Sequence, residues 1–392
     1  MAKIVLYGIQ LDALNRGVGA LTYGHLELLK NNFDFDEIFS VSLGKKNLTK
    51  SISIVIQGKE IKCTEVKFLW WLFLPALFLL PVAKLTKNYS ICPVLNFFKD
   101  VDLVCASNGG DSYTDIYTLK RLFLAFVSIL LVEIMGIKVI FTPQTIGPFN
   151  TLLGKIMGAI PLKLADKVFT RDEKGDVFLN SIGVHSERTR DVSTFMKPQK
   201  VDYEVKPNTI GININGLMWE NNYEGLENCF DSYKTLLKAL TDNLLEKGYN
   251  VLFVPHTYSI TKEFGENDYK AILEFMKNYQ NNEKITYLDK EYTAPELKYI
   301  ISQTDFFIGS RMHSNLAALT TSTPTVALSY SYKFDGTFKM FDVSKCVINA
   351  KNIKENDIPK IVEQILNLIN QKEQIKEKLK KVNSEIKETS FV

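Results

Sequence analysis

The sequence predicts an α/β protein with two Rossmann-like domains that face a cleft, followed by a C-terminal helix. Short apolar runs alternate with helix-like segments along the chain, which is typical of parallel sheets covered by helices. A polar stretch with two prolines, residues 196–208, interrupts this alternation, and the alternation then restarts. A chain of 392 residues, of which 46% are hydrophobic, also has enough apolar material for two cores.

The first half is expected to form an N-terminal α/β domain over residues 1–197. Its predicted strands are residues 3–6, 38–42, 101–106, 138–141 and 168–170, and its predicted helices lie near 19–29 and over 119–135. Each strand is a short apolar run, and each helix has apolar residues at helical spacing.

Residues 68–83 (FLWWLFLPALFLLPVA) carry no charge and contain two prolines. The stretch is shorter than the ~20 residues that a membrane-spanning helix needs. A buried helix or hairpin would account for it. A patch that docks on a membrane surface would also account for it, because Trp70 and Trp71 are adjacent and lysines flank the stretch.

The second half is expected to form a C-terminal α/β domain over residues 207–350 and a helical segment over 351–392. Its predicted strands are residues 209–214, 251–255, 285–288, 306–309 and 325–329, and its predicted helices are 232–247, 268–279, 295–302, 314–320 and 358 to about 387. Two such domains place the carboxyl ends of their strands at a cleft, where ligands of open α/β sheets bind.

Composition excludes several classes of protein. The net charge of +3, from 47 basic and 44 acidic residues, argues against a nucleic-acid binder. The five cysteines form no CxxC pair, and neither an HExxH motif nor a Walker A loop is present, so we expect no metal site. We expect a cytoplasmic protein, and the sequence leaves the oligomeric state open.

Polar residues that directly follow predicted strands are the candidates for a ligand site. In the first half these are Asn108, Gly110 and Asp111, where glycine would let the backbone approach an anion, although a tight turn would use the same residues. Arg171 follows another strand. It could bind a carboxylate or phosphate with two hydrogen bonds, or it could pair with Asp172 at a helix start.

The strongest signal lies in the second half, at Arg311 and His313. A fully apolar strand precedes them and a helix begins at the same point, so both side chains can face one bound anion. A histidine there can also move a proton near neutral pH. His256 and Lys333 follow two other predicted strands, where His256 would otherwise be a core residue and Lys333 a solvated one.

At these same residues the sequence resembles the polysaccharide pyruvyl transferase family. The matching segments are residues 15–20 (NRGVGA), 108–117 (NGGDSYTDIY), 143–149 (PQTIGPF), 169–173 (FTRDE), 254–257 (VPHT), 309–315 (GSRMHSN) and 329–334 (SYSYKF). Each motif is short, but their order fits, and together they are specific.

The resemblance implies an enzyme that transfers the enolpyruvyl carbons of phosphoenolpyruvate to a sugar and forms a cyclic pyruvate ketal. It implies a fold like the two-domain GT-B glycosyltransferase architecture and a place in capsule or exopolysaccharide biosynthesis. Phosphoenolpyruvate would be the donor substrate, and no cofactor is expected. By the resemblance, Arg171, Arg311 and His313 would contact phosphoenolpyruvate, and Lys333 could reach the same anion.

A mechanism follows from this resemblance as a hypothesis. His313 would protonate the methylene carbon of phosphoenolpyruvate or pass a proton through the phosphate, and Asp111 or another acid of the N-terminal domain would take the proton of the attacking sugar hydroxyl. The N-terminal domain would be the acceptor side and the C-terminal domain the phosphoenolpyruvate side. Further residues expected at the acceptor or cleft are Asn15, Asn108, Gly110, Gln144 and His256.

A lipid-linked acceptor would give residues 68–83 a role as a peripheral contact with the inner face of the membrane. Two other functions remain open: a GT-B glycosyltransferase that uses a nucleotide sugar, and a non-catalytic sugar-binding homologue. The acceptor sugar does not follow from the sequence.

Overall fold

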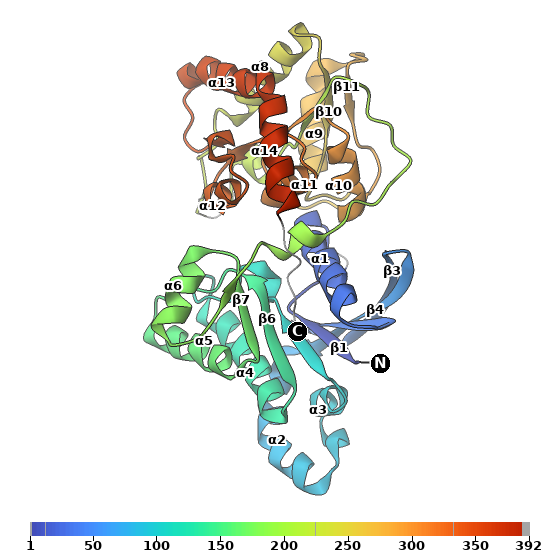
Figure 1. The fold of residues 1–392 in the computed structure, drawn as a ribbon, viewed down its shortest axis with the longest axis vertical. Coiled ribbons are helices and arrows are strands. Elements are labelled where there is room, and N and C mark those ends of the chain that lie inside the picture. Colours follow the sequence, from blue (N-terminus) through green and yellow to red (C-terminus); the bar gives the residue numbers. More distant parts are fainter. Residues whose placement is uncertain (1, 12, 224, 332, 386–392) are drawn as a thin grey trace. The chain divides into compact units, whose positions relative to one another are not determined.

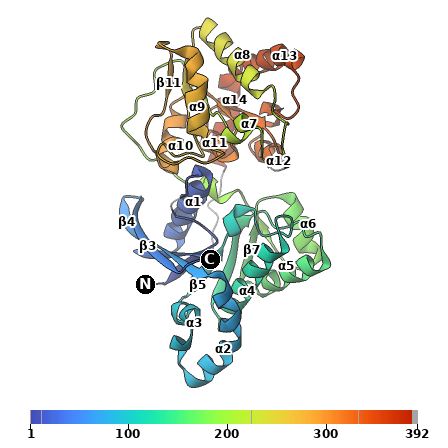
Figure 2. The same cartoon turned by 180° about the vertical axis from the view of Figure 1, so that it is seen from behind.

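The fold is known from a computed structural model that describes residues 2–11, 13–223, 225–331 and 333–385. Among these, residues 2–11 and 21–196 form one compact unit, and residues 13–20 and 197–385 form a second. Figures 1 and 2 show each unit as a sheet with helices packed on it. Each unit is described by itself below.

The sheet of the first unit has the strand order β3-β4-β2-β1-β5-β6-β7-β8. Neighbouring strands are parallel except β3 and β4, which form an antiparallel hairpin at one edge. The strands are β1 (Ile4–Tyr7), β2 (Glu37–Gly44), β3 (Leu48–Ile56), β4 (Lys59–Leu69), β5 (Leu103–Ala106), β6 (Lys138–Gln144), β7 (Lys167–Thr170) and β8 (Glu187–Arg188).

Helices cover both faces of this sheet. The helices and 3-10 turns are α1 (Arg16–Asn32), η1 (Trp70–Leu72), α2 (Phe73–Thr86), η2 (Tyr89–Ile91), α3 (Pro93–Phe98), η3 (Asn108–Gly110), α4 (Leu119–Met135), α5 (Leu152–Leu164), α6 (Glu173–Ser181) and η4 (Val192–Phe195). Buried residues of α2 to α6 join one core cluster, whereas those of α1 after residue 20 join the cluster on the other face. The layered α/β architecture that the alternation of strand and helix predicts is therefore confirmed for this unit.

Local signals set the ends of the helices. The Thr118 side chain accepts a hydrogen bond from the backbone N–H of Arg121, so α4 begins at Leu119. The helix ends where Gly136 adopts a φ of +86°, a conformation that glycine takes without strain. Asp172 caps α6 in the same way by accepting from the N–H of Gly175.

The sheet of the second unit has the order β11-β10-β9-β12-β13-β14, and all of these neighbours are parallel. The strands are β9 (Thr209–Ile212), β10 (Asn250–Phe253), β11 (Ile285–Tyr287), β12 (Phe306–Gly309), β13 (Thr325–Ser329) and β14 (Val347–Asn349). The helices and 3-10 turns are α7 (Gly216–Glu220), α8 (Tyr233–Glu246), α9 (Asp268–Met276), η5 (Lys277–Tyr279), α10 (Ala294–Ser302), α11 (Met312–Thr320), α12 (Lys333–Met340), η6 (Ser344–Cys346), η7 (Glu355–Asp357), α13 (Ile358–Asn370) and α14 (Lys372–Ser384).

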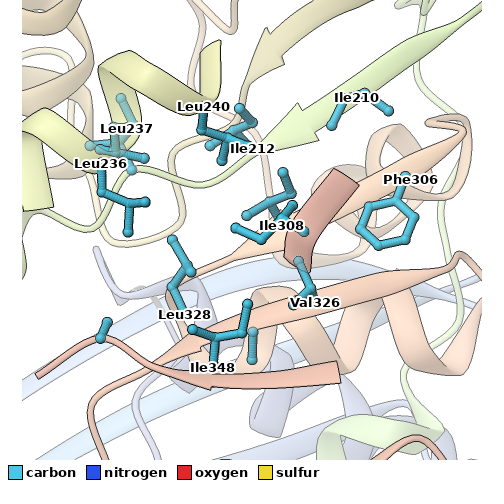
Figure 3. Packing of buried hydrophobic residues seen from close by; sticks show 14 of the residues in the cluster. Ile210, Ile212, Leu236, Leu237, Leu240, Phe306, Ile308, Val326, Leu328 and Ile348 are labelled. Atoms are coloured by element: carbon cyan, nitrogen blue, oxygen red, sulfur yellow. The ribbon is translucent and has the colours of Figure 1, made fainter. Parts of the chain in front are cut away.

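Strand β12 shows how one strand serves two cores. Phe306 and Ile308 belong to the larger cluster, which α8, α9 and α13 also line, whereas Phe307 belongs to the cluster beneath α10. Figure 3 shows Phe306 and Ile308 packed among apolar residues of neighbouring strands and α8. A strand buried on both faces must be apolar throughout, which is why it stood out in the sequence.

Four details differ from the sequence-based expectation. Residues 13–20 group with the second unit, although a domain of residues 1–197 was predicted. The described part of the predicted segment 351–392 is two helices whose apolar sides join the core of the second unit, and residues after 385 lie outside the described part. The β3–β4 hairpin was not predicted. Within residues 68–83 the α-helix begins only at Phe73.

Candidate functional site

The first cluster of candidate residues lies in the second unit, where β12 passes into α11. Strand β12 ends at Gly309, and Arg311 is the N-cap residue of α11, so His313 lies in the first helical turn. A Cβ at Gly309 would lie 2.5 Å from the side-chain nitrogen of Asn315, so this tight turn requires glycine. The turn holds Arg311 and His313 at the carboxyl end of the sheet, as the sequence predicted.

The guanidinium of Arg311 is held by Glu266, in the loop before α9, and by Asp268, the first residue of α9. Its Nη2 donates to Asp268 Oδ1 at 2.8 Å and to the Glu266 carbonyl at 3.0 Å, and its Nη1 donates to Glu266 Oε2 at 3.2 Å. Arg311 is 7% exposed. Burial lowers the pKa of the guanidinium, but the two carboxylates raise it by more, so Arg311 keeps its charge.

Asp268 organises the backbone around Arg311. Its carboxylate is fully buried and accepts hydrogen bonds from the backbone N–H groups of Gly216 at 2.8 Å and of His256 and Thr257 at 3.0 Å each. One side chain therefore fixes the segments after β9 and β10 relative to Arg311. Sequence reasoning missed Asp268, because its only signal was a position at the start of a predicted helix.

His313 lies against the segment formed by residues 13–20. A Cβ on Gly17 would lie only 2.5 Å from His313 Nδ1, so glycine permits this close approach. The Asn15 side chain accepts from the N–H of Gly17 at 2.8 Å, and Asn15 also forms a β-bridge with Thr257. Asn15, His256 and His313 thus belong to one neighbourhood of the second unit.

Arg16 was not predicted as part of the site, but it holds this segment in place. Its Nε donates to the Tyr292 carbonyl at 2.7 Å, its Nη2 donates to Glu291 at 3.1 Å, and its guanidinium lies 4.8 Å from the centre of the Tyr258 ring. The backbone N–H of Arg16 donates to the His256 carbonyl at 2.9 Å. Arg16 is therefore a positioning residue for the segment that contacts His313.

His256 is buried, as the core interpretation of this histidine predicted. Burial lowers its pKa far below the usual value, and the electrostatic effects of His313 and Arg311 lower it further, so its ring is neutral. The hydroxyl of neighbouring Thr257 is also buried and has no hydrogen-bond partner among the described residues.

Lys333 is the first residue of α12, which follows β13, the neighbour of β12 in the sheet.

The second cluster lies in the first unit, where Arg171 directly follows β7. The Arg171 Nη1 forms an ion pair with Asp191, and its Nε donates to Thr145 Oγ1 at 3.0 Å. Burial lowers the pKa of Arg171, but Asp191 and Asp111 raise it by more. Asp172 caps α6 as the structural interpretation predicted, but the ion-pair partner of Arg171 is Asp191 rather than Asp172.

The turn after β5 completes this cluster. Gly110 has a φ of +85°, a conformation that favours glycine, and it lies beside the Arg171 guanidinium. The Asn108 amide donates to Gln144 Oε1 at 3.5 Å, and the Asp111 carboxylate accepts from the Tyr117 hydroxyl at 3.4 Å. The five candidates of the first unit thus lie on adjacent strand ends, those of β5, β6 and β7.

Two other features of the first unit bear on its chemistry. The Ser107 hydroxyl is fully buried at the start of this turn and has no hydrogen-bond partner within the described part of the chain. His25 is buried between the Leu21 carbonyl and Thr142 Oγ1, and burial lowers its pKa to about 4. A neutral, doubly hydrogen-bonded His25 is structural.

The predicted site residues therefore fall into two groups. The second unit holds Asn15, His256, Arg311, His313 and Lys333, and the first unit holds Asn108, Gly110, Asp111, Gln144 and Arg171. Their contact with phosphoenolpyruvate or a sugar stays a prediction. Tyr332 of the last motif lies outside the described residues.

Comparison with known proteins identifies the family. The sequence profile described as "Polysaccharide pyruvyl transferase" matches residues 15–332, and the chain belongs to this family. A curated relative is the amylovoran biosynthesis protein AmsJ of Erwinia amylovora, which is 21% identical over 126 residues. That match spans 32% of this chain and 30% of AmsJ.

Solved structures show the same fold at low sequence identity. The UDP-GlcNAc 2-epimerase of Methanocaldococcus jannaschii is similar with a TM-score of 0.53 and 10% identity, over 94% of this chain and 93% of that one. A trehalose-6-phosphate synthase, OtsA, is similar with a TM-score of 0.50 and 11% identity, over 98% of this chain and 95% of that one. The fold class is therefore GT-B-like, as predicted, and the family supports a transferase of polysaccharide biosynthesis.

Proposed function

We propose that this protein transfers a pyruvyl group from phosphoenolpyruvate to hydroxyls of a sugar in a polysaccharide or lipid-linked repeat unit, with formation of a pyruvate ketal and release of phosphate. The observation that carries this proposal is the placement of His313 in the first turn of α11, directly after a charged and fixed Arg311. Family membership supports the same reaction class.

The second unit offers the features that a donor with a phosphate and a carboxylate requires. The first turn of α11 carries backbone N–H groups that have no partner within the helix, and the helix dipole favours an anion there. Arg311 adds a positive charge, although Asp268 and Glu266 hold its guanidinium. We assign Arg311 to electrostatic attraction and to positioning, and Lys333 to a direct contact with the donor.

His313 is assigned the proton transfer. It donates a proton to the methylene carbon of phosphoenolpyruvate, so that carbon 2 gains oxocarbenium character. A sugar hydroxyl forms a bond to carbon 2 and loses its proton to a base. The bond between carbon 2 and the phosphate oxygen then breaks, phosphate leaves, and a second hydroxyl closes the ketal and loses its own proton. Of the two hydroxyl protons, one replaces the proton that His313 gave to the methylene carbon, and the other leaves with the phosphate as hydrogen phosphate.

The first unit is assigned to the acceptor, with Asp111 as the base. Its carboxylate lies at the end of β5 beside Asn108 and Gly110, and Gln144 follows at the end of β6. These side chains, together with the buried Ser107 hydroxyl, are hydrogen-bonding groups of the kind that sugars require. The family resemblance assigns Arg171 to phosphoenolpyruvate, and an Arg171→Lys variant tests this assignment by the affinity for the donor.

Titration calorimetry with phosphoenolpyruvate and a panel of nucleotide sugars tests the proposed donor. The wild-type protein should bind phosphoenolpyruvate, and His313→Ala should bind it more weakly. His185→Ala is the matched control, because His185 is exposed in a loop of the first unit and should bind as the wild type does. Binding of a nucleotide sugar without binding of phosphoenolpyruvate would overturn the proposal in favour of a glycosyltransferase.

A further inference from the structure

The outer surface of α2, α4 and α5 in the first unit is unusually apolar. We call this surface, together with η1, the apolar helical face. Its exposed large apolar side chains are Trp70, Trp71, Phe78, Val82, Leu85, Leu119, Phe123, Ile134, Leu152, Leu153, Ile156, Ile160 and Leu164. The most exposed are Leu85 at 87%, Phe78 at 80% and Leu152 at 77%.

Helix α2 is apolar on both of its sides. Its inner side buries four residues against the core of the first unit, namely Phe73, Ala76, Leu80 and Ala83. Its outer side exposes Phe78, Val82 and Leu85, which follow one another at the spacing of a helical stripe. A helix that covers a soluble core normally turns polar residues to water, so the outer stripe of α2 requires an explanation.

The three helices form one surface because contacts fix them side by side. At one end of α2 and α4, the Lys120 ammonium lies 4.9 Å from the centre of the Trp70 ring. At the other end, Lys84 Nζ donates to the Ile134 carbonyl at 2.8 Å. Helix α5 is joined to the same layer through the Tyr113 hydroxyl, which donates to the Gly158 carbonyl at 3.0 Å. Figures 1 and 2 both draw α2 beside α4 and α4 beside α5.

The charges on these helices are almost all positive. The basic residues of α2, α4 and α5 are Lys84, Lys120, Arg121, Lys155 and Lys163. The three helices, all within the described residues, contain one acid, Glu133. Burial, and to a smaller extent Asp166, raises the pKa of Glu133 to about 8, so it is largely protonated at neutral pH. The three helices of the apolar helical face thus carry five basic residues and a single acid, which is largely protonated at neutral pH.

We propose that the apolar helical face docks on an anionic lipid bilayer, with Trp70 and Trp71 at the level of the headgroups. Apolar side chains enter the boundary of the acyl chains, and the lysines and Arg121 bind the anionic headgroups. Among the described residues no helix is long and apolar enough to cross a membrane, so the contact is a shallow one. A second copy of the chain is a poorer occupant, because it would bring two sets of like charges together.

Quenching of tryptophan fluorescence by brominated lipids tests this proposal directly. The tryptophans of the chain are Trp70, Trp71 and Trp219, of which Trp219 is buried in the second unit. Vesicles of phosphatidylglycerol with brominated acyl chains should quench the emission of the wild-type protein. In a Trp70→Phe/Trp71→Phe variant the remaining emission of Trp219 should be unchanged by the same vesicles.

Vesicle flotation with matched serine variants tests the apolar contribution. Phe78→Ser/Leu85→Ser should lower the partition onto phosphatidylglycerol vesicles by ten-fold or more, given that each apolar side chain contributes about 1.5–3 kcal/mol when buried. Ile260→Ser/Leu273→Ser is the control, because these side chains are exposed to about 40% in the second unit and should leave the partition unchanged. Equal flotation of the two double variants would overturn the proposal.

The charge requirement has its own test. Partition onto phosphatidylglycerol vesicles should exceed that onto phosphatidylcholine vesicles and should fall as salt is added. Lys155→Gln/Lys163→Gln should lower it by roughly five-fold per lysine. Two results together would overturn the proposal: the protein fails to float with vesicles, and sedimentation velocity shows a dimer that dissociates in Phe78→Ser/Leu85→Ser. The apolar helical face would then be an interface with a second copy of the chain. None of these tests uses phosphoenolpyruvate, so they stand apart from the proposed reaction.

Discussion

The two units share one architectural plan but differ in their outer surfaces. Each has a largely parallel sheet with helices on both faces. In the second unit, the amphipathic helix α13 buries Val362 and Ile365 and exposes charged residues such as Lys360 and Glu363. Among the described residues of that unit, the exposed large apolar side chains are Tyr223, Ile260, Leu273 and Met340. The first unit instead presents the apolar helical face, which the shared fold plan does not explain and for which we propose contact with a bilayer.

The two strand-end arginines make a second comparison. Arg171 follows β7 and pairs with Asp191, and Arg311 follows β12 and pairs with Asp268. Both keep a buried positive charge at the carboxyl end of a parallel strand. The two sites differ in the helix that follows each arginine. The helix after Arg311 contains a histidine, His313, whereas the helix after Arg171 contains none. This difference is our reason for assigning proton transfer to the second unit.

Loss of His313 should give the largest effect. General acid catalysis contributes about 10²–10⁴-fold to rates, so His313→Ala should lower turnover by that factor. Its urea midpoint should stay close to that of the wild type, because His313 is only half-buried in the first turn of α11. Rates of phosphate release and urea titrations measure the two quantities. Near wild-type turnover in His313→Ala would show that another group moves the proton.

Removal of Asp268 should give the largest effect on stability. Asp268→Ala removes the buried ion-pair partner of Arg311 and the acceptor of three backbone N–H groups, and loss of one partner of a buried ion pair costs about 3–5 kcal/mol. Urea unfolding followed by the emission of Trp219 measures this in the second unit. Glu266→Ala, which removes the more exposed partner, should cost less. A loss below about 1 kcal/mol for Asp268→Ala would contradict the organising role of this residue.

Glu133 should make stability depend on pH in the first unit. Its pKa of about 8 in the folded protein lies above the ordinary 4.5, so the folded state binds the proton more tightly. The free energy of unfolding therefore falls as the pH rises from about 4.5 to about 8. Glu133→Gln removes this loss. Relative to the wild type, its free energy of unfolding should therefore be higher at pH 8 than at pH 4 by about 2 kcal/mol, after allowance for the partial exposure of Glu133. A gain that is the same at both pH values would contradict this account.

The smallest effect is expected on the apolar helical face itself. Phe78→Ala should change the free energy of unfolding by less than about 0.5 kcal/mol, because Phe78 is 80% exposed. Leu80→Ala, two residues along the same helix and buried, should cost about 2–5 kcal/mol. Urea titrations of the pair measure the difference. Similar losses for both variants would mean that Phe78 packs against the protein rather than faces outward.

The sequence predicted the buried strands well, but it did not predict which acids pair with the arginines at the strand ends. Strand β12 and the turn at Arg311 and His313 were predicted because a fully apolar run ends in glycine at a helix start. The acids that hold the arginines, Asp268 and Asp191, were missed because each lies far from its arginine or in a loop, and no local pattern marks a long-range ion pair.

Edge elements were missed for a different reason. The outward side of β3 is polar, and its hairpin with β4 lies at the edge of the sheet, so the apolar pattern there is weak. The grouping of residues 13–20 with the second unit depends on tertiary contacts such as those of Arg16 with Tyr292 and Glu291. Such contacts leave no periodic signal in the sequence.

Transfer of label from phosphoenolpyruvate to a sugar tests the central claim most directly. The wild-type protein and His313→Ala would be incubated with phosphoenolpyruvate carrying labelled carbon and with glycolipids from a cell that makes an acidic exopolysaccharide. We predict that the wild type releases phosphate and moves the label into an acid-labile ketal on the sugar, and that His313→Ala does neither. Label that stays in phosphoenolpyruvate, while a nucleotide sugar supplies its sugar to the same acceptor, would contradict the account.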